Sequence, residues 1–331
     1  MASKRPANPL ERIRSLITNE CGGMDVRNVG AMWKWEEAPR MPVEPPSPVW
    51  ELQAELGEGP VWAERDHALW FVDIKKQRIH RYDPATQATH SWDSPEQVGF
   101  ILPAKGGGFV AGLQSGLYHF DETTGGFDLI VEVEPQLPTN RLNDGVVDPA
   151  GRLWFGTMDN GERAKSGAFY CFQEGQLTRT RIEGIAITNG PAVSPDGKLL
   201  YYVDTLKGTI EVAQIRDDGS LGDSRPFVRV DPREGHPDGP TIDSNGYLWI
   251  SLYAGWEARR YAPTGEPVER IRFPVANITK IAFGGDTLRT AFATTARQLL
   301  SPEAIAEQPL IGALFEFHVD VPGVPSPLVR L

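Results

Sequence analysis

The chain has 331 residues, among them 34 Gly and 28 Pro, and a formal net charge of -11 at pH 7. This acidity argues against a nucleic-acid or anionic-membrane surface, because both are recognised through clustered Lys and Arg. A hydrophobic content of 40%, with nine Trp and 14 Phe, is enough for one large core, and the abundant turn formers predict a β protein with few long helices.

Residues 1–48 are predicted to be an N-terminal extension that differs in kind from the rest of the chain. A short apolar face of helical spacing is followed by "APRMPVEPPSPVW", which is typical of an extended, proline-stiffened connection. This arm could dock on the main body, mediate a homodimer or be partly disordered, and a surface arm without chemistry is the favoured interpretation. The apolar face consists of Leu10, Ile13, Leu16 and Ile17.

The sequence favours a cytoplasmic location. No apolar run approaches the ~18 residues that span a bilayer, and "MASKRPANPLERIRSLITNE" has no hydrophobic secretory core. Cys21 and Cys171 lie far apart without a CxxC pattern, which indicates neither a disulfide framework nor a thiolate zinc site. We expect two ordinary thiols in a reducing compartment.

Residues 49–331 contain six copies of one pattern, in which strands alternate with polar turns. The pattern is clearest in "GPVWAERDHALWFVD", "GVVDPAGRLWFGTM", "GPAVSPDGKLLYYVDT" and "GPTIDSNGYLWIS". The copies begin near residues 59, 99, 145, 190, 239 and 281, a period of about 40 to 50 that is typical of four-stranded propeller blades. The sequence therefore predicts an all-β, six-bladed β-propeller with four-stranded blades; unrelated hairpins in a sandwich are the alternative.

Acidic or amide residues precede the first strand in four copies, always just ahead of a Gly. They are Glu58, Asn143 with Asp144, Asn189 and Asp238. A single such sequence is usually only a turn, but Glu is a poor turn residue and the position recurs. Because the first strand of a blade commonly lies innermost, these side chains should meet at one mouth of the central channel.

Converging carboxylate and amide oxygens are what a hard divalent cation requires. We predict that Glu58, Asn189 and Asp238 bind one cation and leave positions open for substrate and water, which implies catalysis. Oxygen ligands suit Ca²⁺, Mg²⁺ and Mn²⁺, while Zn²⁺ and Fe²⁺ also accept carboxylates, so the identity of the metal stays open.

Four motifs, "LGEGPVW", "RLNDGVVDPAGRLWFGTM", "TNGPAVSPDGKLLYYVDT" and "PDGPTIDSNGYLWIS", resemble those of the gluconolactonase, regucalcin (senescence marker protein) and luciferin-regenerating enzyme family. The resemblance extends over roughly residues 50 to 320. It implies a six-bladed propeller, one catalytic divalent cation and hydrolysis of sugar lactones. It also implies that Glu58, Asn189 and Asp238 are the metal ligands, and that Arg141 and Asn143 contact the substrate, with Asp144 as a neighbour.

Two departures from the family pattern bear on the substrate. Pro191 and Pro240 stand where relatives often have Leu and Met, which should stiffen two loops and reshape the pocket wall. The segment "DNGERAKSGAFY" after "GTM" is short, so a substrate-binding carboxylate of some relatives has only two candidate counterparts, Asp159 and Glu162.

The expected reaction is metal-assisted hydrolysis of an aldonolactone, such as a glucono- or xylonolactone, to the open-chain acid. The cation would polarise the lactone carbonyl while a water attacks, and Asp238 is the expected base. A water activated by the cation itself, or Asp204 as base, is the alternative. No GxSxG nucleophile elbow occurs, and His236 is expected to be an exposed loop residue.

Three other functions share this architecture. They are a lactonase or esterase acting on non-sugar cyclic esters, an enzyme of the strictosidine synthase type, and a non-enzymatic binding propeller. A binding propeller would have no reason to bring carboxylates together at one mouth, and the strictosidine synthase type is expected to lack the metal ligands.

Overall fold

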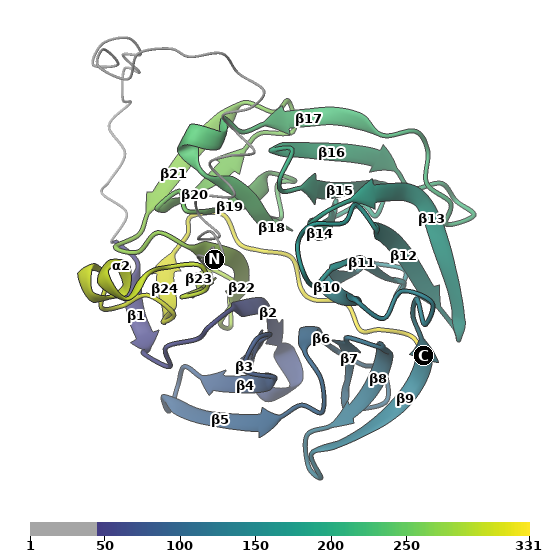
Figure 1. The fold of residues 1–331 in the computed structure, drawn as a ribbon, viewed down its shortest axis with the longest axis horizontal. Coiled ribbons are helices and arrows are strands. Elements are labelled where there is room, and N and C mark those ends of the chain that lie inside the picture. Colours follow the sequence, from purple (N-terminus) through teal and green to yellow (C-terminus); the bar gives the residue numbers. More distant parts are fainter. Residues whose placement is uncertain (1–44) are drawn as a thin grey trace, which may run out of the picture.

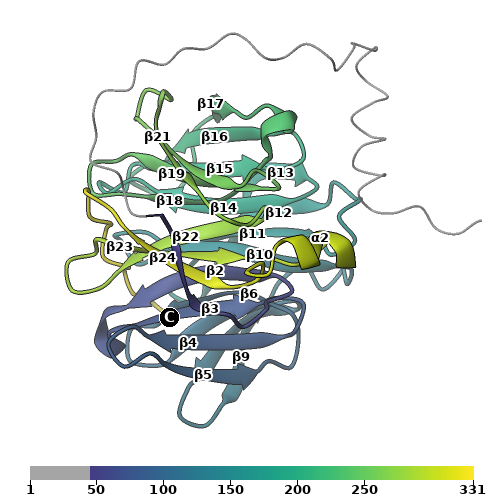
Figure 2. The same ribbon diagram turned by 90° about the vertical axis from the view of Figure 1, so that its left-hand side faces the viewer.

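The strands of residues 45–331, the part of the chain that this computed structural model describes, form six antiparallel sheets of four strands each. Figure 1 shows these sheets arranged as blades around a central channel, and the side view shows them stacked face to face around the ring (Figure 2). The predicted all-β, six-bladed propeller is therefore confirmed. The predicted extension lies, up to residue 44, outside the described residues.

Blades are numbered in chain order. Blade 1 contains β2 (Gly57–Ala63), β3 (Ala68–Asp73), β4 (Arg78–Asp83) and β5 (Ala88–Asp93). Blade 2 contains β6 (Val98–Pro103), β7 (Phe109–Leu113), β8 (Gly116–Asp121) and β9 (Gly126–Glu132). Blade 3 contains β10 (Asn140–Val147), β11 (Leu153–Asp159), β12 (Gly167–Gln173) and β13 (Gln176–Ile185). Blade 4 contains β14 (Thr188–Val193), β15 (Leu199–Asp204), β16 (Thr209–Gln214) and β17 (Arg225–Arg229). Blade 5 contains β18 (His236–Ile242), β19 (Leu248–Tyr253), β20 (Glu257–Tyr261) and β21 (Pro267–Arg272). Blade 6 contains β22 (Ile278–Gly284), β23 (Thr290–Thr295), β24 (Leu314–His318) and β1 (Ser47–Trp50).

The sixth blade joins the two ends of the described chain. Its strand order is β1-β24-β23-β22, so β1 forms the outer edge beside β24, with Ser47 opposite Glu316. The predicted boundary between extension and propeller, at residues 48 and 49, falls inside β1. The only α-helix described within residues 45–331, α2 (Pro302–Glu307), lies between β23 and β24; two 3-10 turns are η1 (Glu64–Asp66) and η2 (Pro232–Glu234).

The first strand of each blade is the innermost one, as the repeat predicts. The inner strands β2, β6, β10, β14, β18 and β22 contact one another in this order around the ring, and β22 also contacts β2. Blades 3 and 6 therefore lie on opposite sides of the channel, as do blades 2 and 5.

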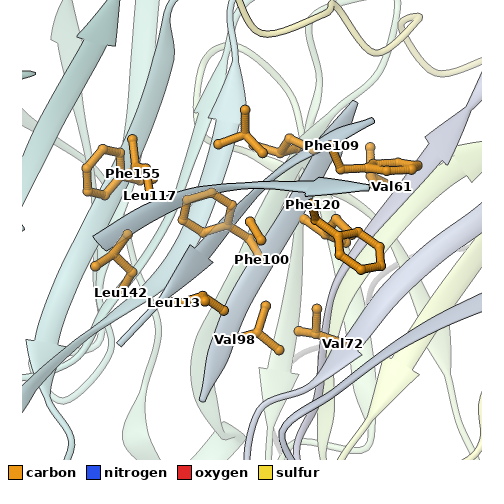
Figure 3. Packing of buried hydrophobic residues seen from close by; sticks show 14 of the residues in the cluster. Val61, Val72, Val98, Phe100, Phe109, Leu113, Leu117, Phe120, Leu142 and Phe155 are labelled. Atoms are coloured by element: carbon orange, nitrogen blue, oxygen red, sulfur yellow. The ribbon is translucent and has the colours of Figure 1, made fainter. Parts of the chain in front are cut away.

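Apolar side chains fill the space between neighbouring blades. The ring of Phe100 on β6 packs against that of Phe155 on β11, with centroids 6.0 Å apart, and Leu142 and Val98 lie beside them (Figure 3). Because each blade buries both faces only when its neighbours are present, the repeats stabilise one another. Cys171 is a buried free thiol within this packing.

Repeated aspartates close the turns between first and second strands. Asp148 accepts hydrogen bonds from Ala150 N (2.9 Å), Arg152 N (3.0 Å) and Trp154 Nε1 (2.9 Å). Asp243 makes the same pattern in blade 5, where it accepts from Trp249 Nε1 (3.1 Å). These aspartates are therefore structural.

A C-terminal strap (residues 320–331) crosses the end of the channel where these turns lie. It bridges to blade 5 at Asp243–Gly323 and to blade 2 at Ala104–Val329, so it spans the ring (Figure 1). Between the strap and the inner strands lies a cavity of about 110 Å³ with mainly apolar walls. No helix within residues 45–331 has the length and apolar character needed to cross a membrane.

Candidate metal centre and substrate site

The three predicted metal ligands lie at equivalent points of three inner strands. Glu58 is on β2, Asn189 on β14 and Asp238 on β18, and the strand pairing becomes irregular just after each of them. All three side chains are buried, with exposed fractions of 4–5%. The repeat thus places them on one end of the channel, opposite the strap.

The glycine that follows each acid holds its carboxylate. Gly59 N donates to Glu58 Oε2 (3.0 Å), and Gly239 N donates to Asp238 Oδ1 (2.8 Å). Gly59 has a φ of 54°, a backbone angle that L side chains rarely adopt. The Glu-Gly or Asp-Gly sequence is therefore a local device that fixes an acid at the rim of the channel.

Burial and neighbouring negative charge disfavour the ionised forms of both acids. Burial and the nearby Asp144 carboxylate raise the pKa of Glu58 to about 8. Burial and the charge of Glu58 raise the pKa of Asp238 well above its usual range. Buried carboxylates whose ionised forms are disfavoured in this way would be stabilised by a bound cation.

These residues fit a hard divalent cation. They offer two carboxylates and one amide oxygen, the donor types that such ions prefer. Within residues 45–331 no group of three or more His, Cys, Asp or Glu side chains is arranged to hold a metal. A site at this rim therefore depends on the amide oxygen of Asn189 in addition to the two acids.

The predicted substrate residues on β10 are linked to Asn189. Arg141 Nη1 donates to Asn143 Oδ1 (2.5 Å), and Asn143 Nδ2 donates to Asn189 Oδ1 (2.9 Å) and to Thr188 O (2.6 Å). Arg141 is 2% exposed, and burial lowers its pKa to about 10, so it stays a cation at neutral pH. The structure brings the predicted metal and substrate residues into one hydrogen-bond network.

Asn143 has the place in blade 3 that Glu58 has in blade 1, since each lies three residues before the valine that pairs with a Trp of the second strand, and the next residue in blade 3 is Asp144. Its Oδ1 accepts from Gly145 N (2.8 Å) and from Lys280 Nζ (2.5 Å), and its Oδ2 accepts from Gly190 N (3.0 Å). Lys280 is a buried residue that sequence reasoning missed. The only signal was its position near the start of the sixth copy.

A second set of polar side chains lines the loops outside the rim. Lys75 Nζ and Arg141 Nε both donate to Asn160 Oδ1, at 2.8 and 3.3 Å. Gln298 Nε2 donates to Glu162 Oε1 (3.2 Å), a contact between loops of blades 6 and 3. The mouth of the site is therefore polar.

The structure separates the two acids of the short segment after "GTM". Asp159 accepts hydrogen bonds from Arg163 N and Ala164 N, both at 3.0 Å, and so shapes its own loop. The charge of Glu162, in contrast, acts on both Arg141 and Lys75, whose pKa values it raises against the larger effect of burial. Of the two, Glu162 lies among the cations of the site.

Two expectations about individual residues were wrong. Pro191 and Pro240 lie within the inner strands β14 and β18, not in loops, because the strand irregularity there accommodates a residue that cannot donate a hydrogen bond. His236 is the first residue of β18 and is half-buried, and burial lowers its pKa.

The alternative base, Asp204, is the last residue of β15. Burial raises its pKa, and the cations that oppose this rise are Lys207 and Lys165. The cation that acts on both Glu58 and Asp238 is Lys280, and Glu58 is also influenced by Arg141. Asp204 therefore has a different electrostatic environment from the two acids at the rim.

Comparisons with known proteins give consistent matches. The family model described as SMP-30/Gluconolactonase/LRE-like region matches residues 56–297. An L-arabinolactonase of Azospirillum brasilense is 36% identical over 264 residues, which are 78% of this chain and 87% of the relative. A 6-deoxy-6-sulfogluconolactonase of Pseudomonas putida is 34% identical over 275 residues, 82% of this chain and 94% of the relative. The crystal structure of a calcium-binding protein, regucalcin, from Agrobacterium tumefaciens matches with a TM-score of 0.84 at 28% identity, and the match covers 87% of this chain and 98% of that one.

Proposed function

The chain belongs to the SMP-30/gluconolactonase/LRE-like family, and we therefore propose that it is a sugar lactonase, a hydrolase of a cyclic carboxylic ester, that works with one divalent cation. The observation that carries the proposal is the pair of buried acids, Glu58 and Asp238, which stand at the same strand position as Asn189 and whose pKa values are both raised. The lactonase names of two relatives that cover most of this chain support the reaction, and the calcium-binding neighbour supports the cation.

Glu58, Asn189 and Asp238 would hold the cation. When bound, the cation would supply positive charge to the lactone oxygen on which negative charge develops. Arg141 is a rigidly held donor, because its guanidinium is tied to Asn143 and Asn160. We assign it to the substrate's carbonyl and hydroxyl oxygens, with Asn143 beside it.

Asp238 is the proposed proton acceptor for the attacking water. Its Oδ1 is fixed by Gly239 N, so Oδ2 is the atom that would take the proton. A general base must lie within hydrogen-bond reach of the proton that it removes, and a rim position shared with the cation ligands meets this requirement for a water bound there.

The polar mouth favours a sugar lactone over an apolar cyclic ester. Lys75, Asn160, Glu162 and Gln298 present ammonium, amide and carboxylate groups to this region, and such groups match the hydroxyls of an aldonolactone such as a glucono- or xylonolactone. An apolar ester could not take up hydrogen bonds from these half-buried groups in exchange for the water that it displaces, which costs binding energy.

The test is a hydrolysis screen with a pH indicator. Metal-stripped protein is given Ca²⁺, Mg²⁺, Mn²⁺, Zn²⁺ or Fe²⁺ in turn and is then offered aldonolactones and unsubstituted alkyl lactones. We expect cation-dependent hydrolysis of the aldonolactones. Hydrolysis of the alkyl lactones alone would replace the sugar substrate with a non-sugar ester, and no hydrolysis with any cation would refute a lactonase.

A further inference from the structure

A buried ion pair crosses the central channel beneath the two rim acids. Lys280 Nζ on β22 lies 2.5 Å from Asp144 Oδ1 on β10, and the two strands belong to opposite blades. Both side chains are almost fully buried, with exposed fractions of 8% and 2%. Lys280 also lines the apolar cavity on the strap side, so the ion pair separates that cavity from the rim.

Gly239, on the neighbouring strand β18, leaves room for the side chain of Lys280. A Cβ atom at Gly239 would lie 2.4 Å from Lys280 Cβ, which is closer than two carbon atoms can approach. Gly239 is the residue directly after Asp238. The sequence that fixes one rim acid thus also lets the lysine stem pass beside it.

Lys280 is not needed to hold Asp144 in place. The carboxylate already accepts hydrogen bonds from Gly145 N and Gly190 N, one on each oxygen. A buried ion pair is also weak support for a fold, since desolvation of both charges offsets their attraction. A structural role therefore leaves the buried ammonium largely unexplained.

The charges of the channel suggest a different role. The charge of Asp144 and the opposite charge of Lys280 both act on each of the two rim acids, Glu58 and Asp238. We propose that Lys280 is a positioning residue for charge: by neutralising Asp144, it leaves the rim with two uncompensated negative charges, which match one divalent cation. This inference rests on the proposed cation site. It adds an explanation of the site's affinity for cations and of its preference for divalent ions.

The experiment measures cation binding directly, without reference to catalysis. Metal-stripped full-length protein and its Lys280→Met, Asp144→Asn and double variants are titrated with Ca²⁺ by calorimetry and with Tb³⁺ by luminescence. Met keeps the length of the lysine stem, and Asn keeps the volume of Asp. The double variant therefore restores the wild-type charge of the site with two neutral side chains.

We expect opposite effects from the two single variants. Lys280→Met should tighten Ca²⁺ binding at least about tenfold, and Asp144→Asn should weaken it at least about tenfold, a change of about 1.4 kcal/mol each. The double variant should return to within about twofold of wild type, the usual error of additivity. Lys280→Met should gain more affinity for Tb³⁺ than for Ca²⁺, because Coulomb energy grows with ion charge.

Arg152→Met is the matched control. It removes the cation of another buried ion pair in blade 3, Arg152 with Asp148, at the turn end of the blade. Its Ca²⁺ affinity should equal that of wild type.

Several results would overturn the proposal. Ca²⁺ affinity that is unchanged or weaker in Lys280→Met would do so, as would a double variant that behaves like Lys280→Met alone. If Lys280→Met does not fold, the double variant decides; its failure to fold would show that the pair is structural. Unchanged affinity in a cation-dependent wild-type lactonase refutes only the role of Lys280, whereas a wild type that binds no cation refutes the proposed metal site as well.

Discussion

Asn143 Nδ2 donates a hydrogen bond to Asn189 Oδ1 over 2.9 Å. This contact links a residue assigned to the substrate with a residue assigned to the cation. Asn143 is held independently by its second bond to Thr188 O. Changes at the substrate side of the network can therefore be separated from changes at the cation side.

Arg141→Ala tests this separation. The variant should raise KM or lower kcat at least about tenfold, because it removes a charged donor to the substrate. Its Ca²⁺ content by elemental analysis should stay that of wild type. Arg163→Ala, which removes an exposed arginine of the nearby loop, is the control with unchanged kinetics. Loss of the cation with retained kinetics would reverse the two assigned roles.

Asp238→Asn tests the proposed base at nearly constant volume. Asn keeps one ligating oxygen but lacks the proton acceptor, so cation affinity should weaken and kcat at saturating cation should fall by about a hundredfold or more, roughly 3 kcal/mol in the barrier. Asp204→Asn, assayed in parallel, should keep most of its activity. A near wild-type rate in cation-saturated Asp238→Asn would move the base to Asp204 or to a water activated by the cation.

Removal of the cation should affect both activity and thermal stability. A cation that binds only the folded state stabilises it by about 2.7 kcal/mol at a free concentration of 100 times Kd. Chelation should therefore abolish lactone hydrolysis and lower the Tm measured by calorimetric scanning, and added cation should restore both. Full activity in protein that elemental analysis shows to be metal-free would contradict the proposed site.

His80 should make the fold sensitive to acid. Burial lowers its pKa from about 6.5 to about 4, assisted by Arg78 and Lys76 and opposed by Asp73. A folded-state pKa below the unfolded value means that stability is complete above pH 6.5 and is lost as the pH falls toward 4. His80→Phe should remove this loss, roughly 2 kcal/mol at pH 4.5.

The measurement is the free energy of unfolding by denaturant, for wild type and His80→Phe, between pH 7.5 and 4.5. As the pH falls, the free energy of unfolding of wild type should decrease more than that of the variant. The stability that both proteins lose when their carboxylates are protonated cancels in this comparison. Parallel curves would show that the folded protein accepts a proton on His80 without cost.

The C-terminal strap should contribute to stability through Val329. Its side chain is fully buried in the cluster that joins blades 1 to 3. Val329→Ala should lower the free energy of unfolding by about 1 to 3 kcal/mol. Leu328→Ala, at the neighbouring residue that is 45% exposed, should change it by less than about 0.5 kcal/mol. Equal effects of the two substitutions would argue that only the backbone of the strap matters.

The repeat explains why the blades and the rim acids could be predicted. Glu58 and Asp238 recur at one point of a period, and an equivalent point on an inner strand must lie at the same end of a closed ring. Lys280 could not be found in this way, since "ITKIAFGG" has no acid or amide ahead of its glycines. Its contact with Asp144 exists only because closure brings opposite blades together.

Local hydrogen bonding set two further limits on what the sequence could predict. Asp159 and Glu162 are both acids, so residue type does not say which of them faces the site. The backbone amides of the short loop decide it, because they bind Asp159 and leave Glu162 to contact Gln298. The strap "DVPGVPSPLVRL" lacks strand character because its prolines cannot donate ladder hydrogen bonds. It crosses the ring through isolated bridges that no periodic pattern indicates.

Pairing of β1 with β24 has a consequence for how the chain folds. Ser47 pairs with Glu316, a residue far away in the sequence. This pairing can form only when nearly all of the chain is available, and it must offset a large loop-closure entropy. During synthesis five blades can form in order, while the edge of the last one stays unpaired and open to pairing with other chains. Premature termination before β24 should therefore yield open arcs that aggregate, rather than smaller propellers.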